Sequence, residues 1–383
     1  MQVLPFILLG SVFALLGVLN DFIPGLPSFW EPFDWTMGKI SLFIAFLIPF
    51  NLMEKKKFRK QRIIAGTTGL ILFLIVITPQ VTAEGTVGFS WITAFGAGGM
   101  FVAIFCGVFT GIIMGLFGKF SFFKEDSTIP EFVRAWFDAM LPIAIVVCTG
   151  WIVILLNNID IYNIIIRLIE PMGKFLETPY GFIFWLTFSC FLYSMGISTW
   201  ILTPVTTPFL LAAITSNMAL VASGVTAASE LNLVTSETVF SAYIWVGGTG
   251  CTLPLIVMML FSKSQYLKSL GRACFVPGVF NINEPVVFGA IAWNPLLMLP
   301  MWIQGIILPI IVWIFTKVIH FAPIPTSLFE MWYVPFPIST WLTTGSVKGL
   351  LLLTIIVIVA TMIWYPFFKT YEMQEVKKEQ QSS

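Results

Sequence analysis

The residues best suited to chemistry lie in one short stretch, FNINEPVVFGAIAWNP, at positions 280–295. It places a single carboxylate, Glu284, after Asn281 and Asn283 and directly before Pro285, with bulky apolar residues on both sides. An ionised carboxylate in apolar surroundings is costly unless it has a partner. We therefore predict that Glu284 contacts a ligand, in preference to capping a hairpin through backbone hydrogen bonds alone. Because proline disfavours the α conformation in the residue before it, we also expect the chain to turn or unwind at Glu284.

Two other stretches supply compatible groups. YSMGISTWILTPVTTPF, at 193–209, combines glycine and proline with several hydroxyl side chains, and WVGGTGCTLP, at 245–254, places three glycines around Thr249. A carboxylate, two amides, a glycine loop that permits close approach and abundant aromatic residues suit a neutral, polyhydroxylated ligand. An ion-coupled carrier could use the same groups. Packing or interfacial anchoring is the favoured role of each nearby tryptophan, namely Trp200, Trp245 and Trp293.

The composition indicates a membrane protein. Hydrophobic residues make up 58% of the 383-residue chain and charged residues only 10%, whereas soluble proteins carry about 25% charge. The net charge of +1 and the single histidine, His320, offer no basis for nucleic-acid binding or for a histidine-based metal site. Five scattered cysteines contain no CxxC pair and are expected to be packing residues. The sequence therefore predicts no metal and no cofactor.

Apolar runs of about 20 residues predict an all-α polytopic membrane protein with about ten transmembrane helices. The expected spans are 3–20, 36–53, 63–82, 92–118, 138–157, 181–203, 204–222, 239–262, 301–321 and 349–368. The segment 279–300 is too broken to be counted as a span. Lysines and arginines gather on the cytoplasmic side of membranes, and the loop EKKKFRKQR after the second span fixes that loop inside. Alternation then gives a multi-pass protein of the cell membrane with both termini in the cytoplasm.

The chain is expected to consist of two membrane halves. An amphipathic interfacial linker at 158–179 separates a packing or dimer-interface half at 1–157 from a transport half at 180–370. The polar end at 371–383 is predicted to be a disordered cytoplasmic tail. The stretches broken by glycine and proline lie in the transport half, and such segments point to the binding site of a transporter.

The fourth expected span repeats small residues at four-residue spacing, and such a stripe lets another helix approach closely in lipid. It either packs internally or forms a dimer seam. The stripe consists of Gly99, Ala103, Gly107, Gly111 and Gly115.

Four blocks of the second half resemble one family. VPGVFNINEPVVFGAIAWNPLLMLP at 276–300, the preceding run SKSQYLKSLGRACFVPG, the loop GGTG at 247–250 and YPFFKTYE at 365–372 are similar to the membrane component, enzyme IIC, of the bacterial phosphotransferase system of the lactose/cellobiose (diacetylchitobiose) type. The resemblance is strongest from about 240 to 372. The N-terminal half matches mainly in hydropathy and in PFILLGS at 5–11.

This resemblance implies a permease that binds a β-linked disaccharide, such as cellobiose, chitobiose or lactose. It would present the sugar's 6-hydroxyl to a phosphocysteine on a separate cytoplasmic IIB protein, which is charged in turn by IIA. The resemblance also implies a homodimer joined through the N-terminal half, and a C-terminal half that moves as a rigid unit and contains two re-entrant hairpins. The chain itself has no phosphocysteine motif, so its catalytic contribution would be to orient the hydroxyl.

Carried over by position, Glu284 would bind the hydroxyl that is to be phosphorylated. The other positions of the implied substrate site are Asn281, Asn283, Pro285, Gly247, Gly248, Thr249, Gly250, Gly196, Ser198, Thr199 and Asn294.

One departure from the family pattern leaves the activity open. Where the family has a Gly-Ile-His-Gly motif, this sequence has Gly196, Ile197, Ser198 and Thr199. A hydroxyl can bind sugar, but it cannot supply the proton transfer or the charge of an imidazole near neutral pH. Either phosphotransfer proceeds without the histidine, or the protein is an orphan relative that binds or transports sugar without phosphorylating it, or a membrane sensor or receptor. Whether the chain serves an enzyme complex depends on this point.

Overall fold

The computed structural model describes residues 4–19, 27–77, 80–81, 87–88, 94–123, 130–199 and 202–382. Trp200 lies outside the described residues. Within them the chain is helical, apart from β1 (Gln80–Val81) and β2 (Val87–Gly88), which form a short antiparallel pair. The chain divides into two compact units. The first unit consists of Met1–Phe13 with Asn20–Pro171, and the second of Ala14–Leu19 with Met172–Ser383.

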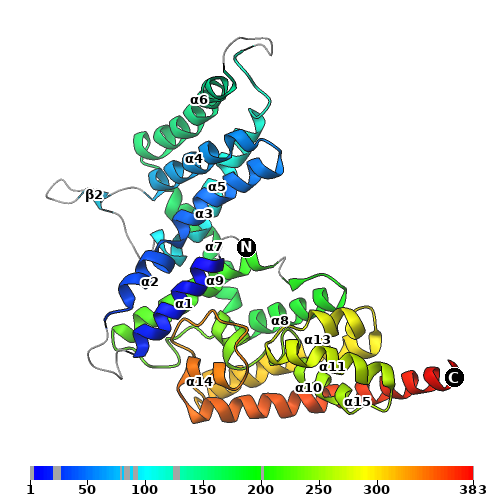
Figure 1. Ribbon diagram of the computed structural model, residues 1–383. Helices are drawn as coiled ribbons and strands as arrows, with labels where there is room; N and C mark the ends of the chain where they lie inside the picture. The colour runs from blue at the N-terminus through cyan, green and yellow to red at the C-terminus, as the bar shows by residue number, and fades with distance from the viewer. Residues whose placement is uncertain are drawn as a thin grey trace. The chain divides into compact units, whose positions relative to one another are not determined.

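The first unit is a bundle of apolar helices, drawn from blue to cyan-green in Figure 1. After α1 (Leu4–Leu19), which contributes to both units, the described elements are α2 (Trp30–Thr36), η1 (Met37–Lys39), α3 (Ile40–Lys55), η2 (Arg59–Gln61), α4 (Arg62–Val76), η4 (Ala97–Gly99), α5 (Met100–Leu116), α6 (Glu131–Gly150), the π-helical η5 (Trp151–Leu156) and most of α7 (Ile161–Leu176). Helix α3 packs on α4 and α5, and α4 also packs on α6.

The small-residue stripe of α5 packs inside this unit. A Cβ at Gly107 would lie 2.8 Å from the Ile48 Cβ and 3.2 Å from the Pro49 Cδ, and a Cβ at Gly111 would collide with Leu52. These positions therefore face α3 at close range, as small residues allow between membrane helices. Of the two roles expected for the stripe, the structure shows internal packing.

The second unit contains the broken segments. Its described elements are α8 (Pro179–Ser194), α9 (Thr203–Ala222), η7 (Glu237–Ala242), α10 (Leu253–Leu260), α11 (Gln265–Val279), α12 (Glu284–Val286), η8 (Val287–Ile291), α13 (Pro295–Trp313), η9 (Ile314–Val318), α14 (Ile338–Thr344) and α15 (Val347–Ser382). Helix α13 packs between α8 and α15, and α10 packs on α11 and α15. One continuous apolar core runs through the unit and includes Phe182, Tyr243 and Trp364.

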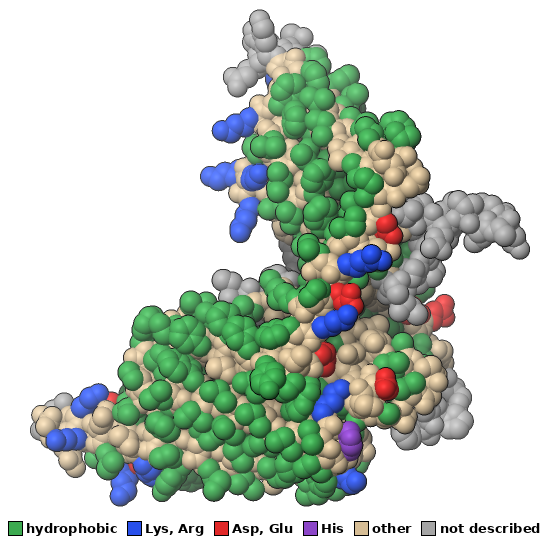
Figure 2. Space-filling view, turned by 180° about the vertical axis from the view of Figure 1, so that it is seen from behind, with side chains coloured by type: hydrophobic (Ala, Val, Ile, Leu, Met, Phe, Trp, Pro, Cys, Tyr) green, Lys and Arg blue, Asp and Glu red, His purple; other side chains and the backbone are tan. Residues whose placement is uncertain are grey.

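Six helices among the described residues are long and apolar enough to span a membrane, or seven if the bent pair α7 and α8 forms one span. Large hydrophobic side chains are exposed on many of the helices, and Figure 2 shows them covering much of the visible surface of each unit. These features make the chain a multi-pass membrane protein. The count is lower than the expected ten, partly because α1, α4 and α8 have only 16, 15 and 16 residues.

The expected span 239–262 is not a continuous helix. Element η7 ends at Ala242 and α10 begins only at Leu253. Between them, Gly247 and Gly248 adopt φ angles of 82° and 94°, which an ordinary side chain disfavours. The prediction of an unbroken transmembrane helix here was wrong, because apolar composition alone does not register this backbone break.

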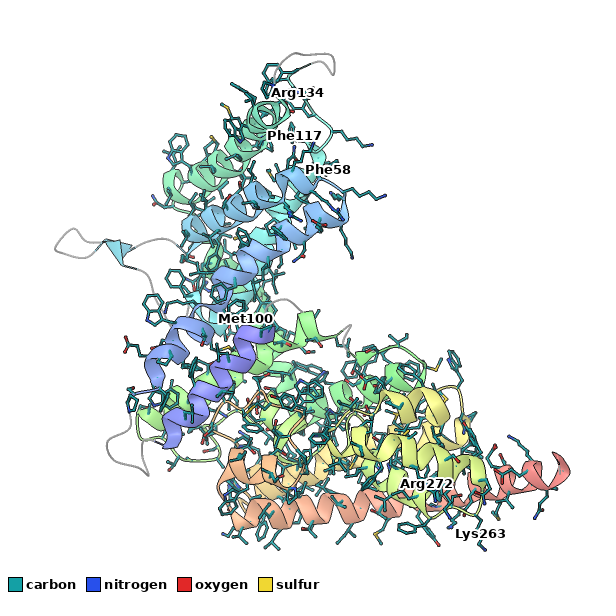
Figure 3. The ribbon with its side chains drawn as sticks, in the orientation of Figure 1. Phe58, Met100, Phe117, Arg134, Lys263 and Arg272 are labelled. Carbon is teal, nitrogen blue, oxygen red and sulfur yellow. The ribbon has the colours of Figure 1, made fainter. Side chains whose placement is uncertain are left out.

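The expected disordered tail also proves to be helical, because α15 continues through it to Ser382. The Glu379 carboxylate accepts hydrogen bonds from the Ser264 hydroxyl at 2.7 Å and from the Tyr266 backbone N–H at 2.9 Å. These contacts supply a cap for the first turn of α11, whose leading N–H groups have no partner within the helix. Figure 3 shows Lys263 and Arg272 in this region, beside the C-terminal part of α15.

Replacing Gly107 by valine is expected to lower the thermal unfolding temperature of the purified protein. The added methyl groups meet Ile48 and Pro49, and overpacking of this kind costs about 1–3 kcal/mol. Val108→Ile is the matched control, because Val108 is 40% exposed and should accept a methylene with little change. An unfolding temperature for Gly107→Val equal to that of the wild type would contradict the close packing of α5 on α3.

Candidate functional site

The Asn281 side chain joins three segments of the second unit. Its Oδ1 accepts a hydrogen bond from the Gly247 N–H at 3.0 Å. Its Nδ2 donates to the carbonyl of Trp332 at 2.8 Å and to that of Val334 at 3.0 Å. Asn281 itself has a φ of 60°, a left-handed conformation that asparagine tolerates better than most residues. Asn281 therefore holds the glycine loop and the segment before α14 in place, and both of its amide donors are used for this purpose.

Asn283 holds the other side of the glycine loop. Its Nδ2 donates to the Thr249 carbonyl at 2.8 Å and to the Thr252 hydroxyl at 3.2 Å, and Thr252 in turn donates to the Gly247 carbonyl at 2.5 Å. A Cβ at Gly248 would lie 2.5 Å from the Asn283 Cγ. The glycine is thus required both by its φ angle and by the close approach of the amide.

Glu284 begins the short helix α12, and Pro285 occupies its first turn. This placement corrects the expectation that the chain unwinds at Glu284, because the break lies just before it, at the left-handed Asn281. Proline is compatible with the first turn of a helix, where its missing N–H would have no partner. Glu284 is half-buried and Pro285 is exposed. The carboxylate lies within electrostatic and hydrogen-bonding reach of the buried Tyr193 hydroxyl at the end of α8.

Gly196, the first residue of the segment that differs from the family motif, lies next to Trp293, near the end of the stretch 280–295. A Cβ at Gly196 would be 3.3 Å from the Trp293 Nε1, and the Trp293 backbone N–H donates to the Ser194 carbonyl at 3.1 Å. Ser198 and Thr199 follow and are half-buried. The contacts therefore bring the turn after α8 beside residues 293–294.

Asn294 has a structural use. Its Oδ1 accepts from the Leu296 N–H at 3.2 Å, which makes it the N-cap of α13, and its Nδ2 donates to the Ala290 carbonyl at 3.1 Å. Such caps satisfy backbone donors at the start of a helix. Asn294 was expected to line the ligand site. Its amide oxygen and nitrogen are instead both used in hydrogen bonds to the backbone around the start of α13.

The structure joins five predicted positions, Gly247, Gly248, Thr249, Asn281 and Asn283, into one hydrogen-bonded or closely packed unit beside Glu284. Sequence reasoning missed Tyr193, Thr252 and the two carbonyls at 332 and 334. Tyr193 lies within a stretch that the sequence singled out, so its polar tip in apolar context was a usable signal. No group of three or more metal-ligating side chains occurs among the residues that the structure describes.

Taken together, apolar spanning helices around a broken, amide-braced segment with one half-buried carboxylate define a membrane transport protein. The comparisons identify its family. The family described as "Phosphotransferase system, EIIC" matches residues 1–305, which is most of the chain. The protein belongs to this family and is a sugar permease component of a phosphotransferase system.

Individual relatives resemble the chain over nearly its whole length. The cellobiose-specific EIIC component of Geobacillus stearothermophilus is 28% identical, over 98% of this chain and 89% of the relative. The oligo-beta-mannoside-specific EIIC component of Bacillus subtilis (strain 168) is 26% identical, over 100% of this chain and 90% of the relative. The crystal structure of ChbC, the IIC component from the N,N'-diacetylchitobiose-specific phosphotransferase system, matches with a TM-score of 0.87 and 27% identity, covering 99% of this chain and 93% of that one.

Gly248→Ala tests the contact between the glycine loop and Asn283. We expect it to lower the unfolding temperature by more than Gly224→Ala does. Gly224 has a similar φ of 89° but no atom within 4 Å of a built Cβ, so both variants pay about 1–2 kcal/mol for the left-handed backbone. Only Gly248→Ala adds the clash with Asn283, worth about 1–3 kcal/mol more. Equal shifts in the two variants, measured by thermal unfolding in detergent, would contradict the close approach.

Proposed function

We propose that the protein translocates a β-linked disaccharide and presents its 6-hydroxyl for phosphorylation by a separate IIB protein. The observation that carries the proposal is the placement of Glu284. Its neighbours Asn281 and Asn283 are committed to the backbone of the glycine loop, whereas the carboxylate at 284 is half-buried at the start of α12. A carboxylate held by a rigid frame can bind and orient one hydroxyl, and orientation is the main protein contribution to phosphoryl transfer.

The names of the relatives support the sugar class. Those described above are specific for cellobiose, for oligo-beta-mannosides and for N,N'-diacetylchitobiose, and lactose-specific EIICB components are 24% to 36% identical to the chain over the aligned regions. Each is a sugar of linked pyranose units. We propose a disaccharide of this kind for the present chain.

Within the proposed site the residues have different tasks. Glu284 contacts the hydroxyl, with Asn283, Pro285, Thr249, Ser198 and Thr199 and the backbone of residues 196 and 247–250 lining the sugar. Asn281 and Asn294 act mainly by fixing the surrounding backbone, as their hydrogen bonds indicate.

We also propose the membrane topology and the division of the chain into halves. About ten crossings place both termini in the cytoplasm, and the loop between α3 and α4, with its lysines and arginines, lies on that side. Helices α11 and α12, which flank the break around Asn281, belong to one re-entrant hairpin, and α14 belongs to the second. Residues 1–157 form the homodimer half, 158–179 the linker and 180–370 the transport half, and IIA supplies phosphate to IIB.

Glu284→Gln is expected to reduce uptake of the transported disaccharide by about 10- to 100-fold, because a hydrogen bond to a charged group contributes about 1.5–3 kcal/mol. Uptake would be measured with a panel of labelled β-disaccharides in vesicles that contain phosphoenolpyruvate and the general, IIA and IIB components. Glu230→Gln serves as the control, since Glu230 is exposed. Uptake by Glu284→Gln close to that of the wild type, at equal amounts of inserted protein, would remove Glu284 from the site.

The Ser198 position favours one second candidate, an orphan relative that transports or senses sugar without phosphorylating it. The same vesicles separate the two functions, because the internal sugar can be scored for phosphate. We expect phosphorylated product that requires IIB, and a further increase in Ser198→His at neutral pH, since an imidazole can accept a proton there. Thr199→His controls for adding a histidine nearby. Free sugar inside, with no gain in Ser198→His, would establish the orphan reading.

A further inference from the structure

Two carboxyl groups of the second unit meet at one hydroxyl. Glu237, at the start of η7, is fully buried. Ser236 Oγ contacts the Glu237 Oε2 at 3.3 Å and also hydrogen-bonds the Glu330 Oε1, and the two carboxyl groups lie within hydrogen-bonding reach of each other. Glu330 is half-buried. Neither residue belongs to the six candidate spans or to the sugar site described above.

One shared proton would satisfy this arrangement. The Ser236 hydroxyl has one hydrogen and can donate it to only one of the two carboxyl groups. The second carboxyl group then has no donor at this point unless one of the two carboxyl groups is protonated. Two like charges at this range would otherwise repel each other in a poorly solvated place.

No positive charge offsets the pair among the residues that the structure describes. The ionisable group that faces Glu237 is Glu330, and the one that faces Glu330 is Glu237. Helix α14, which packs on η7, contains no charged residue. The lysines of neighbouring segments have other contacts, Lys317 with the Leu231 carbonyl and Lys348 with the Phe321 ring. Burial, and for Glu237 the adjacent Glu330 carboxylate, raises the pKa of both groups above the usual value for glutamate.

The pair sits where two segments are fastened together. Glu237 Oε1 accepts from the Phe329 N–H at 3.0 Å, and Ser241 Oγ donates to the Phe329 carbonyl at 3.2 Å. The Tyr243 hydroxyl donates to the Pro323 carbonyl at 2.7 Å. Residues 323–330 are thus held along η7, and only two residues further on the Trp332 carbonyl accepts from Asn281.

We propose that Glu237 and Glu330 share one proton, and that this protonated pair positions residues 329–334 so that the carbonyls at 332 and 334 meet the Asn281 amide. The pair is a positioning device and does not touch the sugar. Its effect on the glycine loop follows from the contacts alone, whereas its effect on sugar binding rests on the proposed function.

The direction of the pH dependence follows from the raised pKa values. The native state holds the shared proton more tightly than the unfolded chain does, so the stabilisation is fully present below the unfolded pKa of glutamate, about 4.3. It is lost as the pH rises through the raised pKa of the folded pair. Above that pH both groups ionise, and their repulsion separates Phe329 and the following residues from η7.

Hydrogen exchange measured by mass spectrometry on the full chain in detergent tests the proposal without any sugar. Exchange of a peptide covering 326–334 would be compared at about pH 6 and about pH 9, on either side of the raised pKa, after correction for the intrinsic rates. We expect protection to fall by about tenfold or more in the wild type, since one pKa unit corresponds to a tenfold change in population. Glu330→Gln should stay protected at both pH values, because its amide can donate to Glu237 without a titrating proton.

Glu230→Gln is the control, since it removes an exposed carboxylate of the preceding loop and should keep the wild-type loss of protection. Equal protection of the wild type at both pH values would overturn the proposal, as would a wild-type pH response in Glu330→Gln. Glu237→Gln, whose amide oxygen can still accept from Phe329, gives a second variant with the same expectation. Binding of β-disaccharides to the same samples should weaken at the higher pH only in the wild type and the control. A failure of binding alone would count against the proposed substrate, not against the pair.

Discussion

One side-chain amide carries the arrangement on which the site depends. Where the chain leaves the helix inside a membrane protein, each exposed N–H and C=O must find a partner within the protein. Asn281 meets this constraint with a single carboxamide, because it can accept from one backbone N–H and donate twice to carbonyls. It satisfies the Gly247 N–H and the carbonyls of Trp332 and Val334 together. The glycine loop, the segment around Asn281 and residues 332–334 are thereby held together, and Glu284 follows Asn281 by three residues.

The Glu284 carboxylate differs from the polar side chains around it, because those side chains are used in hydrogen bonds to the backbone. Asn283 and Thr252 are also committed to the glycine loop, and Asn294 is committed to the start of α13. The polar groups near Glu284 therefore serve largely to hold backbone, and η8, which follows α12, packs on α8 and α13. A frame of this kind around one half-buried acid suits the hydroxyl-orienting role proposed for Glu284, because misplacement by about 1 Å can lower the rate of a positioned reaction about 100-fold.

Much of this could be predicted from the sequence, but in an uneven way. Long apolar runs identified helices such as α3, α5 and α13, and the break in the chain near Pro285 was visible from the residue types. The exact position of that break was not, because the left-handed turn at Asn281 depends on partners about 35 and 50 residues away in the chain. The Trp332 and Val334 carbonyls left no signal, since every residue has a carbonyl. The polar tail was predicted to be disordered because its composition is polar. The contacts that stabilise its helix, such as Glu379 with Ser264, join residues far apart in the sequence and could not be seen from the tail alone.

The contact between Glu379 and the start of α11 has a consequence for biosynthesis. Ser264 leaves the ribosome 115 residues before the carboxylate that accepts its hydroxyl, so the first turn of α11 lacks this cap during most of the synthesis of the second unit. The helix that leads into Asn281 and Glu284 therefore gains this contact only after the chain has been extended to Glu379. A nascent chain that stalls before Glu379 already contains Asn281 and Glu284, yet it lacks this contact, and the start of α11 then relies on the Ser264 hydroxyl, which accepts from the Leu267 N–H.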